Sequence, residues 1–164
     1  MRKGIVIVCI LLLVCSVTLC ACDGNIVEEN AKFVELSTWH FTSGVPNNLI
    51  RVKHSNPNAK FQLTTDKGKF VEYPDWPQTV TLDNDDIISW QGLDGKIDLA
   101  YVDIIVTIDD NIVGYAVIQI VRHRENLLYY DAAVVKSVVF PQVDGQYQKV
   151  SQKQIEAKIK AAKG

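Results

Sequence analysis

Cysteine is missing from most of this 164-residue chain. All four cysteines fall within the first 22 positions, at Cys9, Cys15, Cys20 and Cys22. The rest of the chain therefore cannot build a disulfide framework or a cysteine-ligated metal site.

A strong excess of one charge is also missing, because 17 basic residues face 19 acidic ones and the formal net charge is −2. Proteins that bind nucleic acid usually present a basic face, so we expect no nucleic-acid partner. Apolar residues are plentiful at 48%, which argues against disorder. The length suits one domain with a sizeable core.

The chain begins with the pattern of a secretory signal peptide. Arg2 and Lys3 form a short basic segment, and an apolar run follows over residues 5–14. An uncleaved signal anchor is an alternative, because residues 4–22 are nearly long enough to span a bilayer. An ordinary secretory signal is another.

The signal segment ends in Leu19, Cys20, Ala21 and Cys22. An aliphatic residue and two small residues before a cysteine resemble the lipobox of bacterial lipoproteins. The resemblance implies that residues 1–21 are removed and that the thiol of Cys22 carries diacylglycerol. Acyl chains contribute about 0.8 kcal/mol per buried CH₂ and hold such proteins on a membrane.

The expected location is therefore the extracytoplasmic face of a bacterial cell membrane, with the membrane bound through the N-terminal lipid. Residues 22–31 then form the lipidated cysteine and a short tether. The resemblance covers the leader alone and implies nothing about the body.

The body, residues 32–148, alternates short apolar runs with turn residues, which predicts a mostly β domain. The period-two pattern predicts strands at residues 32–41, 48–54, 60–65, 69–73, 78–82, 86–90, 97–108, 112–122 and 127–140. Short strands with frequent turns favour an antiparallel β-sandwich that resembles immunoglobulin-like domains in pattern. A β-barrel is the alternative.

One α-helix is expected at the C-terminus, within residues 149–164. Ser151 and Gln154 have the spacing of a capping box, and Ile155, Ile159 and Ala162 share one face. This segment is basic, with five lysines against one glutamate. We favour a solvated helix over one that contacts anionic lipid head groups.

Catalytic patterns are sparse in the body. No serine lies in a Gly-x-Ser-x-Gly elbow, and no spacing pairs His40, His54 or His123 with a nucleophile. The three histidines also lack the spacing of a zinc site. We therefore expect a protein that is not an enzyme and has no cofactor.

Acidic turns offer a calcium alternative. Asp83, Asp85 and Asp86 lie between two predicted strands, and calcium takes six to eight oxygen ligands from such loops. Aspartate is also common in turns for backbone reasons, and we favour that interpretation.

Aromatic side chains are the candidate binding residues. Tyr73 and Trp76 lie in a proline-rich loop that cannot join a ladder, so we expect them to contact a ligand or partner. Trp39 and Trp90 are expected in the core.

The sequence thus predicts a membrane-anchored lipoprotein with a non-catalytic binding domain for a protein or glycan partner. The alternatives are an inhibitor or immunity-type protein that acts through the loop at Tyr73 and Trp76, an envelope hydrolase, and an oligomer formed through the outer face of residues 127–140.

Overall fold

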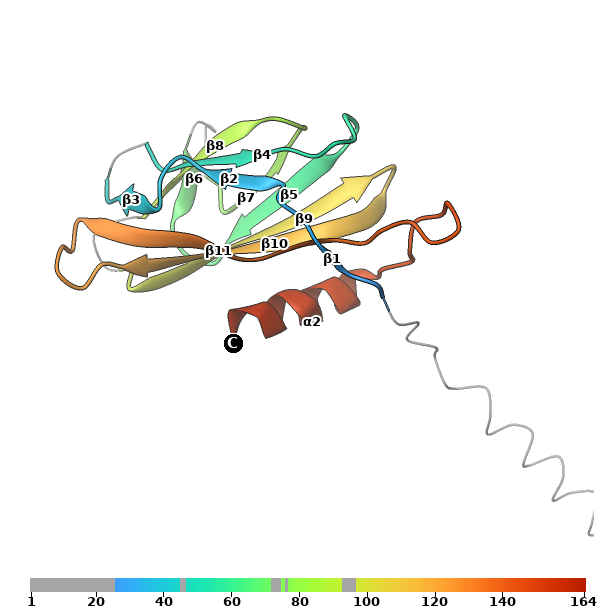
Figure 1. The fold of residues 1–164 in the computed structure, drawn as a ribbon. Helices are drawn as coiled ribbons and strands as arrows, with labels where there is room; N and C mark the ends of the chain where they lie inside the picture. Colours follow the sequence, from blue (N-terminus) through green and yellow to red (C-terminus); the bar gives the residue numbers. More distant parts are fainter. Residues whose placement is uncertain (1–25, 45–46, 72–74, 76, 93–96) are drawn as a thin grey trace, which may run out of the picture.

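A computed structural model describes residues 26–44, 47–71, 75, 77–92 and 97–164 of the chain. The described elements are eleven strands and a C-terminal helix (Figure 1). In chain order they are β1 (Glu29–Asn30), β2 (Val34–Leu36), β3 (His40–Thr42), β4 (Leu49–Val52), β5 (Lys60–Thr65), β6 (Lys69–Val71), β7 (Thr79–Leu82), β8 (Ile87–Gln91), β9 (Leu99–Ile108), β10 (Asn111–Arg122), β11 (Tyr129–Val139) and α2 (Gln152–Lys163).

Two antiparallel sheets face each other, as the predicted β-sandwich requires. The larger sheet has the order β1-β11-β10-β9-β5-β7, with β3 also paired to β11, and the smaller has the order β2-β4-β8-β6. Since the two sheets are separate over the described residues, the barrel alternative is excluded. No helix in this part of the chain is both long and apolar enough to cross a membrane.

The hairpin of β9 and β10 forms the centre of the larger sheet. Asp109 and Asp110 at its tip have φ values of +48° and +63°, which give a tight turn that matches the twist of paired strands. On β9 every second side chain is buried between the sheets, namely Ala100, Val102, Ile104, Val106 and Ile108.

Trp90 lies at the centre of the core between the sheets, with no exposed surface, as predicted. Its indole Nε1 donates to Oγ1 of Thr65 at 3.1 Å and to the carbonyl of Lys67 at 3.2 Å. Its ring meets Tyr130 edge-on, with the centroids 5.6 Å apart. These contacts hold the indole in one place.

The helix α2 packs on the outer face of the larger sheet and adds a third layer (Figure 1). Ile155 and Ile159 are buried there against Tyr115 and Val117 of β10. The capping box predicted at Ser151 is present.

Two lysines of the helix form ion pairs with the sheet layer. Lys158 binds Glu28 and Lys163 binds Asp103, each at 2.7 Å. These two cations of the basic segment therefore face acidic groups of the same chain.

The predicted strand at residues 32–41 is divided between the two sheets. The chain pairs with β11 at β1, crosses to the smaller sheet as β2, and returns to β11 as β3. β1 itself lies within the range predicted as tether, and Glu29 pairs with Val139.

Candidate functional site

Three of the predicted site residues, Cys22, Tyr73 and Trp76, lie outside the described residues. The predicted lipidation and the predicted aromatic loop therefore stay predictions.

The aspartates considered for calcium are bound by groups of the same chain. Asp85 accepts from Nη2 and Nε of Arg51 at 2.6 and 2.8 Å, and Oδ2 of Asp86 accepts from the backbone N–H of Asp83 at 3.0 Å. Asp85 has a φ of +73°, a conformation that aspartate tolerates in turns. The described residues contain no group of three or more histidine, cysteine, aspartate or glutamate side chains placed to share a metal ion.

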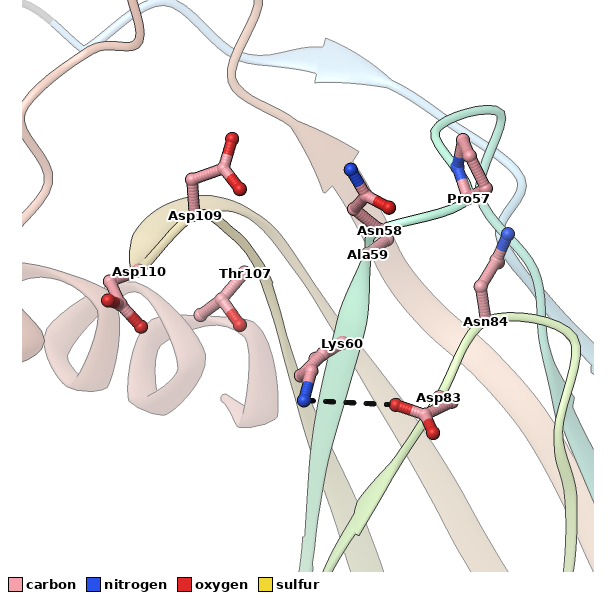
Figure 2. A pocket seen from close by; sticks show the side chains of 9 residues that line it. All are labelled: Pro57, Asn58, Ala59, Lys60, Asp83, Asn84, Thr107, Asp109 and Asp110. Atoms are coloured by element: carbon pink, nitrogen blue, oxygen red, sulfur yellow. Dashed lines mark ion pairs between the residues drawn. The ribbon is translucent and has the colours of Figure 1, made fainter.

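A polar hollow of about 570 Å³ lies beside this turn (Figure 2). Its lining includes Asp83 from the turn, Lys60 from β5, and Asp109 and Asp110 from the hairpin tip. Asp83 faces Lys60, 4.0 Å away, while the hairpin aspartates lie across the hollow (Figure 2). These carboxylates do not converge on one point.

A second hollow, of about 420 Å³, brings together two of the histidines. It is lined by His40, His123, Asn126 and Tyr129. β3 pairs with the beginning of β11, which places His40 opposite Asp131 and Thr42 opposite Tyr129. His123 follows β10 and donates its backbone N–H to the carbonyl of Tyr129 at 2.9 Å.

His40 is close to a carboxylate. Its Nδ1 lies 3.0 Å from Oδ1 of Asp131, within ion-pairing distance although not aligned as a hydrogen bond. This Nδ1 atom is buried within the protein. A neutral His40 with its proton on Nδ1 has Nε2 free as an acceptor.

His123 has the opposite arrangement. Its Nδ1 accepts from the backbone N–H groups of Glu125 and Asn126, at 3.3 and 3.2 Å. A neutral ring that accepts at Nδ1 carries its proton on Nε2. His123 in this tautomer presents a donor at Nε2, and its ring centroid lies 5.9 Å from that of His40.

The prediction that Trp39 belongs to the core is wrong. Its side chain is 67% exposed, and its ring lies against His40 with the centroids 3.3 Å apart. The reason is its place in the chain: residues 37–39 cross from the smaller sheet to the larger, so no opposite sheet covers Trp39.

Exposed apolar side chains surround this hollow. Leu127 and Leu128, in the loop between β10 and β11, are 62% and 63% exposed. The backbone N–H of Ser43, just after β3, donates to the carbonyl of Leu128 at 2.7 Å, so the loop and β3 lie side by side. We define the aromatic end as the surface made by Trp39, His40, His123, Leu127, Leu128 and Tyr129.

The aromatic end lies far from the point where the described chain begins. β3 pairs with Tyr129–Asp131 at one end of β11, whereas β1 pairs with Val138 and Val139 at the other. Six residues of strand lie between the two pairings, so Asp131 and Val138 are about 23 Å apart along the strand. Figure 1 shows β3 and β1 towards opposite ends of the sheet.

Sequence reasoning considered each histidine and Trp39 separately and did not predict this site. The usable signal was the sequence Trp39, His40 and Phe41, in which alternation places His40 and Phe41 on opposite faces. Their meeting with His123 and Asp131 depends on the pairing of β3 with β11 across about 90 residues of chain.

Comparison of the chain with protein-family models, with curated proteins and with solved structures finds no match to any of the three.

Proposed function

We propose that the chain is an extracytoplasmic lipoprotein, anchored through Cys22, whose β-sandwich is a non-catalytic binding domain. The aromatic end is its binding surface. The observation that carries this proposal is the 67% exposure of Trp39, whose ring lies against His40 of the second hollow. Tryptophan is enriched among the residues that dominate binding energy, and exposed apolar clusters often mark interaction sites.

The position of this surface supports the proposal. Six residues separate Cys22 from Glu28, so a fully extended tether spans at most about 20 Å. The domain would then stay near the membrane, with β1 on the tethered side. The aromatic end lies farther along the sheet, where a partner can reach it.

A binding role fits the second hollow better than hydrolysis. His40 beside Asp131 is a pair that a hydrolase could use as its base. The described residues that line this hollow, however, include no serine, threonine or cysteine that could act as a nucleophile. Two histidines that each have Nε2 left for a hydrogen bond suit the binding of a polar ligand without any reaction.

The anchor is tested by labelling the full-length chain in bacteria with an alkyne-tagged fatty acid. We expect label on the wild-type chain and none on Cys22→Ala, because the thiol is the acceptor. Label that persists on Cys22→Ala would contradict lipidation at this residue. The matched control is Cys20→Ala, which removes a neighbouring thiol that the cleaved protein would not contain.

The binding surface is tested by placing the photo-reactive residue benzoylphenylalanine at position 127 or at position 143. Leu127 lies on the aromatic end, and Val143 is 50% exposed in the segment before α2. We expect adducts in living cells from position 127 alone, and their loss in the added variant Trp39→Ala. Equal yields of adduct from positions 127 and 143 would contradict the proposal, and so would a yield at position 127 that Trp39→Ala leaves unchanged.

A further inference from the structure

We propose that the hollow at the aromatic end is a carbohydrate-binding site. A sugar ring lies against the exposed aromatic side chains, and its hydroxyl groups bond to Nε2 of His40 and Nε2 of His123. This inference rests on the proposed function, because it names the ligand class of the same surface.

The hydrogen-bonding capacity of the two histidines is the first support. Nδ1 of His123 accepts two backbone N–H groups, and Nδ1 of His40 is buried 3.0 Å from Oδ1 of Asp131 without being aligned as a hydrogen bond. Each ring therefore has Nε2 left for a ligand: on neutral His123 it is a donor, and on His40 it donates or accepts according to which ring nitrogen carries the proton. A hydroxyl group is both donor and acceptor, so neighbouring hydroxyls of a sugar satisfy this pair.

Asp131 adds a further acceptor. Its side chain is 49% exposed although Oδ1 lies beside His40. The carboxylate can therefore accept a bond from a ligand hydroxyl, and bonds to a charged group are stronger than neutral ones.

Two aromatic rings supply the apolar part of the site: Tyr129 lines the hollow, and Trp39 lies next to it against His40. Trp39 is 67% exposed and Tyr129 39% exposed, so both rings keep surface for a ligand. The face of an aromatic ring carries partial negative charge, which attracts the C–H groups on one face of a sugar. The Trp39 ring packs against His40, and this contact restricts the indole before a ligand binds. The indole therefore loses less conformational entropy on binding.

The size of the hollow favours a saccharide over a protein segment. Its volume of about 420 Å³ is within the range of small-molecule sites. A stable protein partner would instead need about 800 Å² of surface on this chain, reaching beyond the hollow to Leu127 and Leu128. The two ligand classes therefore depend on different residues of the aromatic end.

Calorimetry on the full-length chain tests the proposal, in a zwitterionic detergent because sugar-headed detergents would compete. The probes are chitotetraose, cellotetraose, maltotetraose and mannotetraose. We expect at least one to bind, and both Trp39→Ala and His123→Asn to weaken its binding roughly tenfold or more. Asparagine at position 123 keeps an acceptor for the loop N–H groups and lacks the Nε2 donor.

The matched control is Leu127→Ala, which trims the aromatic end outside the hollow and should leave saccharide affinity unchanged. Sugar affinity that is lost in Leu127→Ala and kept in His123→Asn would overturn the proposed site. Failure of all four sugars to bind would overturn the ligand class.

Failure of all four sugars to bind can be distinguished from failure of the proposed function. If crosslinking from position 127 still depends on Trp39 while no sugar binds, the partner is a protein and the binding surface stands. If no sugar binds and Trp39→Ala leaves crosslinking from position 127 unchanged, both proposals fail.

Discussion

The ammonium group of Lys158 lies 2.7 Å from a carboxylate oxygen of Glu28, 130 residues earlier in the chain. Lys136 of β11 approaches the other oxygen of Glu28 at 3.5 Å. One carboxylate thus connects α2, β11 and the residue just before β1. The contact fixes the start of the described chain against the helix, at the end of the sheet away from Trp39.

The first prediction concerns the stability that this contact contributes. Lys158→Met should lower the free energy of unfolding by about 1 kcal/mol at neutral pH, the upper range for pairs of this exposure. Lys160→Met is the matched control, because Lys160 is exposed on the same helix and forms no ion pair with the described residues. Urea denaturation of both variants measures the difference.

The pH dependence of this difference follows from Glu28. Burial raises the pKa of Glu28, but the hydrogen bond and charge of Lys158, with Lys136, outweigh it and leave the pKa below its usual value of 4.5. A lowered folded pKa means stability that is present above about 4.5 and lost as pH falls through the folded value. The cost of Lys158→Met should therefore shrink at about pH 3; a cost independent of pH would contradict the assigned pair.

The second prediction concerns alkaline pH. Burial, with the charge of Glu28, raises the pKa of Tyr115 to about 12. Since the folded pKa exceeds the unfolded value of 10, Tyr115 should reduce stability progressively as pH rises from 10 to about 12. Denaturation across this interval should show a smaller loss for Tyr115→Phe. Identical losses in both proteins would place Tyr115 in contact with solvent.

The third prediction compares two glycines with the same backbone conformation. Gly44 has a φ of +73° with nothing within 4 Å of an added Cβ, whereas at Gly68 (φ +80°) a Cβ would lie 2.7 Å from the Trp90 ring and from the carbonyl of Gln91. Each alanine substitution carries a strain of about 1 kcal/mol from the left-handed conformation. Because hydrogen bonds hold Trp90 in place, Gly68→Ala should cost about 2 kcal/mol more than Gly44→Ala. Thermal or urea unfolding checks the difference, and equal costs would show that the indole can move.

The fourth prediction concerns catalysis. A binding domain should not turn over ester, phosphodiester or glycoside reporter substrates in a way that depends on His40. Purified full-length wild type and His40→Asn should therefore give the same background rates. A rate that falls at least about a hundredfold in His40→Asn would instead reveal a general base, since such groups contribute at least that much.

Strand periodicity was sufficient to predict the central sheet, because β9 buries alternate side chains. It also predicted the range of β10, but it did not predict that most side chains of this strand are buried on both faces. The helix α2 covers Tyr115 and Val117 there, and a single strand pattern does not reveal a third layer. The cap at Ser151 was predictable because both of its partners lie within four residues.

The site was harder to predict than the fold. His40 and Asp131 meet through the pairing of β3 with β11, and the split of residues 32–41 between two sheets decides which face Trp39 occupies. Such a crossover leaves little local signal, because Thr38 and Trp39 in the crossing segment are residue types that are also enriched in strands. The sequence prediction placed Trp39 in the core and gave His40 and His123 no role, because only the long-range pairing of β3 with β11 brings these residues together.

The most direct test of the account is the affinity of the full-length chain, held in nanodiscs, for isolated envelopes of cells that lack its gene. The dissociation constant is compared for the wild type, Trp39→Ala and Val143→Ala. The account predicts that Trp39→Ala weakens binding roughly tenfold or more, as expected for a tryptophan anchor, and that Val143→Ala binds like the wild type. Equal affinities for all three proteins would contradict the assignment of the aromatic end as the binding surface.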